Sequence, residues 1–392
     1  MSQRLIGLNP DLEQLRNEGY DLAIRGGYLV IQDVPYVTSQ GVVERGTLIS
    51  PLTLDEGEHT EKPNTHVCYW MGEHPCHGDG QPIRGFENQS PRQDLGDGLT
   101  NVLTFSAKAD YRDFHHKMTT YLGRIVGEAQ RLDSTATAQT YPVFEIEDEA
   151  ESVFKYADTA SSRAGIGALN EKLTAQRIAI VGLGGTGAYI LDLVAKTQVR
   201  EIHLFDGDLF SSHNAFRAPG AASLDQLRAK QQKVTYFATL YAAMRRGIHP
   251  HNEYLSAGNL AQLRGLDFVF LCLDRGAVKR DLVAALEEFG VPFIDVGMGV
   301  TRSEQGLGGV LRVTTSTPAS REMARKRIPF VDDDGEENEY KTNVQIAELN
   351  ALNATLAVIR WKKWAGFYRD SGGEHNTSYA IAPNALVGED II

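Results

Sequence analysis

The chain has 392 residues, enough for two domains of ordinary size, each with its own hydrophobic core. Hydrophobic residues make up 42% of the sequence and charged residues 23%, which are the proportions of globular proteins. The formal net charge of −12 argues against nucleic acid or an anionic membrane as the main partner, because both need a basic face.

Cysteine usage and the N-terminal residues indicate the compartment. The chain has three cysteines, Cys68, Cys76 and Cys272, which are too few for a disulfide framework and cannot all pair because their number is odd. Such cysteine usage is typical of a reducing compartment. Residues 1–6 have no long apolar core, and no stretch reaches the roughly 18 apolar residues of a membrane span. The sequence therefore predicts a soluble cytoplasmic protein.

Residues 1–150 predict a small α+β domain, a candidate for binding a protein partner. A short helix is expected over 9–18 and a longer one over 111–132, where apolar residues recur at helical spacing. Strand-like runs are expected at 20–25, 28–34, 46–54, 65–71 and 103–107. Gly26-Gly27 is a hairpin signal. Residues 72–98, rich in Gly, Pro, His and Asp and containing Asn88, predict a long surface loop.

An acidic run at 145–151 marks the expected linker to a second domain, residues 151–392. Here strands and helices alternate, which predicts an α/β fold with a mostly parallel sheet. Strands are expected at 178–181, 202–205, near 254, 266–273 and 293–296, and helices at 159–173, 188–196, 224–246, 277–289 and 343–364. An antiparallel pair is expected within 297–315 and a polar excursion over 316–338.

The sequence is organised around a strand, a glycine-rich turn and a helix. Gly182, Gly184, Gly185 and Gly187 form the turn, where side chains would hold the backbone away from a ligand. Phosphate oxygens can then meet the free N–H groups and the positive dipole end of the helix. The next strand ends at Asp206, whose carboxylate can accept a hydrogen bond from a ribose hydroxyl. This pattern predicts an adenine-nucleotide site, with an NAD-dependent oxidoreductase as the default interpretation.

Three further features favour a nucleoside triphosphate over a dinucleotide. Asn214 and Arg217 follow the ribose acid, and a triphosphate needs clustered cationic groups. Lys230 and Lys233 offer an ammonium to the same phosphates. A hydrophobic strand runs directly into Asp274, and an acid at that end of a strand can hold Mg²⁺ that bridges triphosphate oxygens. Together these residues suit adenylyl transfer from ATP.

These residues also form the combined pattern of a known family. The pattern comprises Val181-Gly-Leu-Gly-Gly-Thr-Gly, Asp206-x-Asp208, Asn214, Arg217, Lys233-Val and Asp274. Residues 155–365 thus resemble the ThiF-like, ubiquitin-activating-type adenylyltransferase family. The resemblance implies a Rossmann-like homodimer that uses ATP and Mg²⁺ to adenylate the C-terminal glycine of a ubiquitin-like protein. The first domain resembles modules that precede such domains in bacterial ubiquitin-like conjugation operons, which adds a conjugating enzyme as a candidate partner.

The resemblance implies roles for single residues. Nucleotide contacts are implied for Gly182, Gly184, Gly185, Gly187, Asp206, Asp208, Asn214, Arg217, and either Lys233 or Lys230. Catalytic roles are implied for Arg217, for Lys233, for Asp274 as the magnesium ligand, and for Arg163 as an arginine finger in the neighbouring subunit's site. The acceptor carboxylate would attack the α-phosphorus of ATP, helped by positioning and charge stabilisation without a general base.

The sequence departs from full activating enzymes in its cysteines. No cysteine follows Asp274, where such enzymes form a thioester, and the paired Cys-x-x-Cys zinc sites of many bacterial relatives are absent. Cys272 is expected to be a small buried residue inside its strand. The loop with Cys68 and Cys76 fits no common zinc spacing, so zinc is not expected. An NAD(P)-dependent oxidoreductase and a nucleotide-sensing scaffold without catalysis remain the alternatives.

Overall fold

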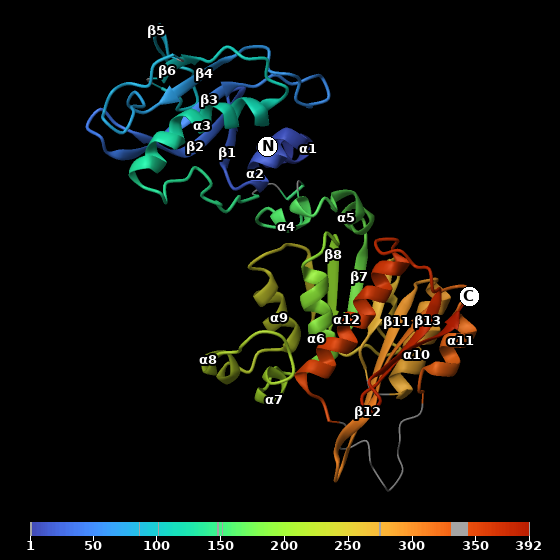
Figure 1. The fold of residues 1–392 in the computed structure, drawn as a ribbon. Coiled ribbons are helices and arrows are strands. Elements are labelled where there is room, and N and C mark those ends of the chain that lie inside the picture. The colour runs from blue at the N-terminus through green and yellow to red at the C-terminus, as the bar shows by residue number, and fades with distance from the viewer. Residues whose placement is uncertain are drawn as a thin grey trace. The chain divides into compact units, whose positions relative to one another are not determined.

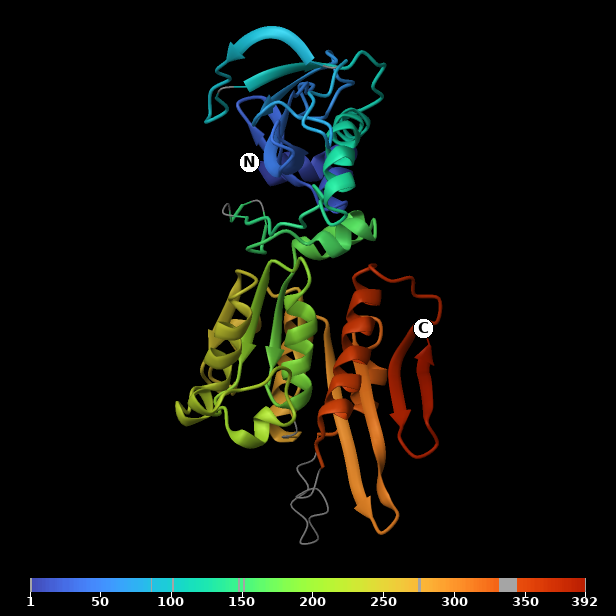
Figure 2. The same cartoon turned by 60° about the vertical axis from the view of Figure 1, so that its left-hand side comes forward.

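The computed structural model describes residues 2–85, 87–100, 102–146, 149–150, 152–273, 276–330 and 344–391. It divides into two compact units (Figures 1 and 2). The first consists of Met1–Glu151 and Tyr156–Gly165, and the second of Ser152–Lys155 and Ile166–Ile392. Within the described ranges, no helix combines the length and the apolar character that a membrane crossing requires.

The first unit is built on a six-stranded antiparallel sheet with the order β1-β2-β3-β4-β6-β5. Its strands are β1 (Asp21–Arg25), β2 (Tyr28–Val37), β3 (Val43–Pro51), β4 (Val67–Met71), β5 (Glu87–Gln93) and β6 (Val102–Ser106). Its helices are α1 (Ser2–Leu8), α2 (Pro10–Asn17), α3 (Phe114–Leu132) and α4 (Thr159–Arg163). The α+β character predicted for this part of the chain is confirmed by the sheet and its helices.

Helix α3 supplies much of the core of this unit. The Asp113 side chain caps the helix by accepting a hydrogen bond from His116 N–H at 2.7 Å. Apolar residues that recur every three or four positions, among them Met118 and Ile125, are fully buried in one cluster with residues of β2 and β3. The helical spacing in the sequence is therefore the spacing of the face that packs on the sheet.

The first unit confirms one turn prediction and corrects one loop prediction. Gly26 and Gly27 have φ of 53° and 80°, and Arg25 pairs with Tyr28 across them, so the predicted hairpin is present. The loop predicted over 72–98 is wrong in part, because β5 lies within it and pairs with β6. The sequence of β5, Glu-Asn-Gln-Ser-Pro-Arg-Gln, has no alternation of apolar and polar residues that would indicate a strand.

The second unit is built on an eight-stranded sheet with the order β14-β13-β12-β11-β10-β7-β8-β9. The run from β11 to β9 is parallel, and β12, β13 and β14 extend it antiparallel. The strands are β7 (Arg177–Val181), β8 (Glu201–Phe205), β9 (Ile248–His251), β10 (Phe268–Leu271), β11 (Phe293–Ser303), β12 (Gly306–Ser316), β13 (Glu374–Ala380) and β14 (Ala385–Ile391). The predicted α/β class with a mostly parallel sheet is confirmed.

Helices cover both faces of this sheet (Figure 1). The helices are α5 (Gly167–Thr174), α6 (Gly185–Ala195), α7 (Ser212–Ala215), α8 (Leu224–Arg228), α9 (Lys233–Tyr241), η1 (Leu260–Leu263), α10 (Gly276–Phe289), α11 (Arg321–Arg327) and α12 (Ala347–Trp364). Alternate residues of β7 face opposite ways: Ile178 and Ile180 pack with α6, α9 and α12, whereas Ala179 and Val181 pack with α10 and α11. Both faces are buried, as a parallel sheet requires.

Several boundaries in the second unit differ from the prediction. The single helix expected over 224–246 is two helices, because Lys230 between them has φ of 46°, in the left-handed region. The strand expected near Tyr254 is β9, a few residues earlier. The excursion over 316–338 contains α11, and residues 331–343 lie outside the described part of the chain. The antiparallel pair within 297–315 is confirmed as β11 and β12.

The order of the strands reverses at β7. From β7 the chain continues through β8 and β9 on one side, and then through β10 and β11 on the other. In open α/β sheets, ligands bind beyond the carboxyl ends of the strands at such a reversal. The turn after β7 and the residues after β10 meet there: Cys272 N–H donates to Val181 O at 2.8 Å, and a Cβ on Gly182 would lie 2.6 Å from Cys272 O.

Candidate nucleotide site

A cavity of about 440 Å³ lies at this reversal, bounded by the ends of β7, β8 and β10 and by β11, β12 and α12. Seven of the predicted site residues line it: Gly182, Gly184, Gly185, Asp206, Asp208, Arg217 and Lys233. Gly187, Asn214, Lys230 and Arg163 are not among its lining residues. Asp274 lies outside the described residues, although Cys272 and Leu273 directly before it line the cavity.

The glycines of the turn are required for different reasons. A Cβ on Gly187 would lie 1.9 Å from Gly182 O, and one on Gly185 would lie 2.3 Å from the Asn350 side chain, so both positions serve close packing. Gly182 has φ of 91°, which a side chain rarely tolerates. Gly184 lines the cavity, and a Cβ at this position would have no other atom within 4 Å, so a side chain there would enter the space left for a ligand.

This difference predicts that alanine substitutions at Gly187 and Gly184 change different properties, folding stability in the first case and ligand binding in the second. Gly187→Ala is expected to destabilise the second unit by about 1–3 kcal/mol, because the clash with the backbone outweighs a gain in helix propensity of about 1 kcal/mol. Gly184→Ala is expected to leave the melting temperature unchanged and to weaken ATP binding. Thermal unfolding and calorimetric titration of both variants with ATP check this. Equal loss of stability in the two variants would contradict the assignment.

Asp206 holds the turn in place. Leu183 N–H donates to its Oδ2 at 2.7 Å and Asp208 N–H donates to its Oδ1 at 2.8 Å, and the side chain is buried. A carboxylate oxygen offers about two acceptor positions, so Oδ1 can still accept a ribose hydroxyl, whereas Oδ2 also lies 3.5 Å from Lys233 Nζ. Asp206, which the sequence suggested as the ribose-binding acid, thus also links the segments that follow β7 and β8.

Of the two candidate lysines, the structure places Lys233 on the cavity. Its Nζ lies 2.6 Å from Asp208 Oδ2 and 3.5 Å from Asp206 Oδ2, and the side chain is buried. Its backbone N–H donates to Asp208 O at 2.9 Å, which fixes the start of α9 beside the two acids. Lys230 is exposed in the turn before α9. Lys233 would therefore reach phosphate while remaining beside two carboxylates.

Arg217 is positioned by the short helix α7. The Asn214 side chain is buried and accepts from Ser211 N–H at 3.0 Å, and Arg217 N–H donates to Asn214 O at 3.1 Å. Within the described ranges no carboxylate pairs with the Arg217 guanidinium, and its buried Nε has no hydrogen-bond partner. Asn214 therefore positions Arg217 through the turn at the end of α7. Among the described residues, Arg217 is a cation without a counterion on the cavity wall.

A buried ionic triad that the sequence analysis missed forms another part of the wall. Asp295 Oδ1 lies 2.9 Å from Lys279 Nζ, and Asp295 Oδ2 lies 2.6 Å from an Arg312 guanidinium nitrogen. The Asp295 side chain is 0% exposed and that of Lys279 3%. Lys279 comes from α10, Asp295 from β11 and Arg312 from β12, and both cations line the cavity. Two cations share one carboxylate, so the triad carries a net positive charge.

The thiols are not disposed for nucleophilic catalysis. Cys272 was expected inside a strand, but β10 ends at Leu271 and Cys272 is a half-buried residue of the cavity wall. Burial, with a smaller contribution from the charge of Asp295, raises the pKa of its thiol. Burial also raises the pKa of Cys76 and raises the pKa of Cys68 to about 12. These shifts disfavour the thiolate, which is the nucleophilic form of cysteine.

Arg163 belongs to the first unit. It is the last residue of α4, and its guanidinium carbon lies 5.4 Å from the centroid of the Tyr141 ring in the same unit. A cation at this distance from an aromatic face is attracted by the ring quadrupole. Its action in the site of a neighbouring subunit stays a prediction.

The second unit is thus a Rossmann-like α/β protein whose cavity at the strand reversal presents a glycine turn, a ribose-type acid and cationic side chains. Residues 159–369 match the ThiF family over more than half of the sequence, and the chain belongs to this family. Residues 10–159 match a domain of unknown function, DUF6791.

Individual relatives agree with this assignment at low identity. The chain is 24% identical over 163 residues to ubiquitin-like modifier-activating enzyme 5 of Culex quinquefasciatus, which covers 38% of this chain and 40% of that protein. The corresponding protein of Xenopus laevis is 23% identical over 168 residues, 39% of this chain and 41% of that protein. The chain therefore spans about two fifths of the length of these curated relatives.

Two solved structures are also similar. PaaA is 18% identical, with a TM-score of 0.44 over 57% of this chain and 76% of that chain. Escherichia coli MccB, solved with ATP, is 14% identical, with a TM-score of 0.41 over 57% of this chain and 66% of that chain.

Proposed function

We propose that the second unit is an adenylyltransferase that uses ATP to activate the C-terminal carboxylate of a peptide or small protein. The observation that carries this proposal is the Arg217 guanidinium, which has no counterion among the described residues and shares one cavity with the glycine turn and Lys233. A dinucleotide site needs little positive charge at this position, whereas a triphosphate needs several cationic groups. Membership of the ThiF family supports the same activity.

We further propose a ubiquitin-like protein with a C-terminal glycine as the acceptor, within a bacterial conjugation system that includes a conjugating enzyme. Support comes from the curated relatives, which are ubiquitin-like modifier-activating enzymes. The cavity continues from the glycine turn to Gly297 and Met298, beside Lys279 and Arg312. An extended C-terminus could enter along this wall with its carboxylate near the net positive triad. The active form would be a homodimer in the cytoplasm, with Arg163 reaching the partner subunit's site.

In the proposed reaction, an acceptor carboxylate oxygen forms a bond to the α-phosphorus of ATP. The bond between the α-phosphorus and the bridging oxygen to the β-phosphorus breaks, and pyrophosphate leaves. The carboxylate is already ionised, so no group of the chain has to remove a proton. Glycine-turn N–H groups would orient the phosphates, and Arg217 and Lys233 would stabilise the charge that develops on the departing oxygens.

Mg²⁺ is the expected metal of this reaction. Mg²⁺ prefers carboxylate oxygens, and Asp206, Asp208 and Glu253 line the cavity, but among the described residues their donor atoms do not converge into a three-ligand site. Asp274 remains the proposed principal ligand. When bound, the ion would supply positive charge to the triphosphate oxygens. The chain's own contribution is to hold the phosphates and the acceptor carboxylate in line.

Pyrophosphate exchange into ATP tests the proposal. With Mg²⁺ and a protein or peptide that ends in a free glycine carboxylate, labelled pyrophosphate is expected to enter ATP, and the same acceptor with a C-terminal amide is expected to give none. Asp274→Ala should abolish exchange. Binding of NAD without binding of ATP would instead indicate the oxidoreductase alternative. Binding of ATP without exchange for any acceptor would indicate a nucleotide-sensing scaffold.

A further inference from the structure

One face of the edge of the second sheet carries a cluster of imidazoles and a carboxylate. Strands β8 and β9 pair in parallel, with His203 opposite His249 and Phe205 opposite His251. Side chains alternate along a strand, so Glu201 and His203 share a face with His249 and His251, while Ile202 and Leu204 point into the core. Because β9 is the last strand of the sheet, this face lies at an edge that solvent can reach.

The donor atoms in this cluster converge. One donor atom each from Glu201, His203 and His249 lies within 4.8 Å of the other two, and in the described part of the chain this is the one group of at least three such residues that could hold an ion. The His203 and His249 rings stack with their centroids 4.8 Å apart. His249 is exposed, and the side chains of Glu201 and His203 are 21% and 17% exposed, so an ion could enter from solvent.

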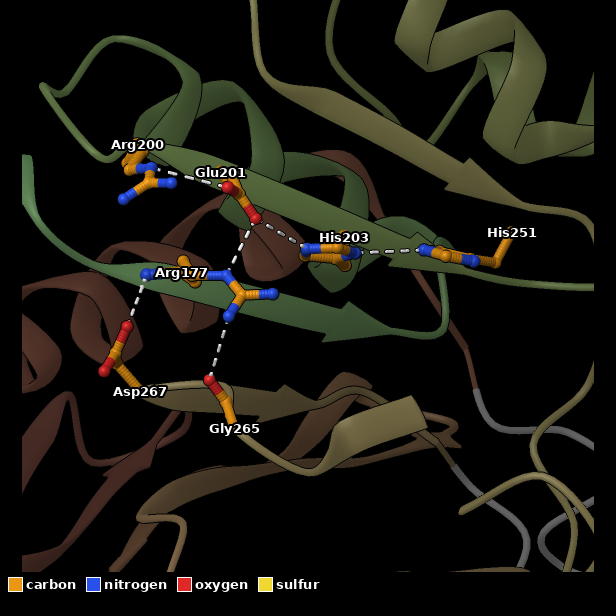
Figure 3. Close-up of polar contacts among 7 residues, drawn as sticks. All are labelled: Arg177, Arg200, Glu201, His203, His251, Gly265 and Asp267. Atoms are coloured by element: carbon orange, nitrogen blue, oxygen red, sulfur yellow. Dashed lines mark hydrogen bonds and ion pairs between the residues drawn. The ribbon is translucent and has the colours of Figure 1, made fainter. Parts of the chain in front are cut away.

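A fourth residue, His251, orients the imidazole ring of His203. His203 Nε2 faces Glu201 Oε2 at 3.3 Å, and His203 Nδ1 faces His251 Nε2 at 3.0 Å (Figure 3). If Nδ1 donates its proton to His251, the lone pair of Nε2 faces Glu201 Oε2. Histidines that bind metals usually donate their other N–H to a neighbouring acceptor in this way.

We propose that Glu201, His203 and His249 form a binding site for a divalent transition-metal ion such as Zn²⁺, with His251 as the residue that orients His203. Two imidazoles and one carboxylate are a donor set that zinc accepts, with a fourth position open for water. This site lies on a different element from the cysteine loop for which zinc was rejected, and it does not depend on the proposed adenylation.

The ion would draw the cluster together. Zinc–nitrogen bonds of about 2.0–2.1 Å place tetrahedral donors about 3.3 Å apart, so the widest pair has to close by about 1.5 Å. His249, at the exposed edge, can supply this movement by rotating its side chain. Glu201 also accepts from Arg177 Nε at 2.8 Å and lies 3.4 Å from Arg200 Nε (Figure 3). The two guanidinium groups hold the carboxylate in place and lower the affinity for the ion.

Titration of the chelator-treated full chain with Zn²⁺ tests the site. Calorimetry in excess Mg²⁺ is expected to show one Zn²⁺ per chain, and Co²⁺ is expected to give the visible absorption of a tetrahedral site. His249→Ala should weaken zinc binding by about 100-fold or more. His251→Phe preserves stacking on Phe205 and should weaken binding by about 10-fold, the lower end of the cost of losing a hydrogen bond that orients a metal ligand.

His59→Ala is the matched control, because His59 is an exposed histidine of the first unit and should leave zinc binding unchanged. His249→Ala is preferred to substitutions of His203 because an exposed side chain can be removed without disturbing the core. Failure of the wild-type chain to bind Zn²⁺ stoichiometrically would overturn the proposal, as would equal affinities in the wild type, His249→Ala and His203→Ala.

Discussion

Arg217→Ala is expected to lower the rate of pyrophosphate exchange by about 10²–10³-fold, the usual loss when one preorganised donor to a developing oxyanion is removed. Arg217 should show the largest effect among the cavity cations because the others already have counterions: Lys233 pairs with Asp206 and Asp208, and Lys279 and Arg312 share Asp295. The loss should appear in kcat and in kcat/KM, since the developing charge belongs to the transition state.

Arg228→Ala is the matched control for this experiment. Arg228 is an arginine of the same crossover segment, its side chain is 75% exposed, and its partner is the exposed Asp225 at 3.4 Å. Its removal should leave exchange within about 2-fold, since exposed ion pairs contribute little. If Arg217→Ala exchanged pyrophosphate as fast as Arg228→Ala, Arg217 could not be a phosphate ligand.

Asp295→Ala is expected to destabilise the second unit by about 3–5 kcal/mol, the cost of leaving buried charges without their partner. The substitution would leave Lys279 and Arg312 close together without a counterion, and Lys279 is buried between α10 and β11. Hydrogen exchange of peptides from β11 and β12 across a urea series measures the change where the triad lies. Adding Lys279→Met to Asp295→Ala should recover part of the loss, because one of the stranded charges is then removed.

Asp225→Ala provides the comparison for Asp295→Ala. The Asp225 side chain is 93% exposed, so losing its pair with Arg228 should change the free energy of unfolding by less than about 1 kcal/mol. Equal effects of the two substitutions would show that the triad is screened by water and is not a buried ionic cluster.

The features that the sequence predicted are those with local signatures. The strand, glycine turn and helix around Gly182, the hairpin at Gly26-Gly27 and the alternation of strands and helices depend on residues that are neighbours in the chain. Seven of the predicted site residues line one cavity because the carboxyl ends of β7 and β8 are adjacent in a parallel sheet. For these, spacing along the sequence was enough.

The features that were missed depend on pairings between distant segments. The ionic triad requires α10 packed against β11 and β11 paired with β12. The imidazole cluster requires His203 opposite His249, a register that local patterns do not specify. A signal was nevertheless present in the triad. Asp295 interrupts the apolar run of β11, and Lys279 lies three residues before Leu282 on the buried face of α10. A charge on a buried face needs a partner.

The break between α8 and α9 could not be read from composition. Lys230 is a good helix former, yet it adopts a left-handed conformation there. The residues after Lys230 pair with the segment that follows β8: Leu209 forms an isolated bridge with Gln232, and Phe210 N–H donates to Gln231 O at 2.8 Å. Tertiary pairing with the chain after Asp208 thus overrides helix propensity, and it also places Lys233 beside the two acids.

The two backbone hydrogen bonds that Asp206 accepts have a consequence for nucleotide binding. One carboxylate fixes both the turn after β7 and the first residues after β8, so these segments cannot shift independently. The backbone at this end of the cavity should therefore be ordered before the nucleotide binds. Binding should then cost little backbone conformational entropy. Any induced fit would have to come from elsewhere in the site.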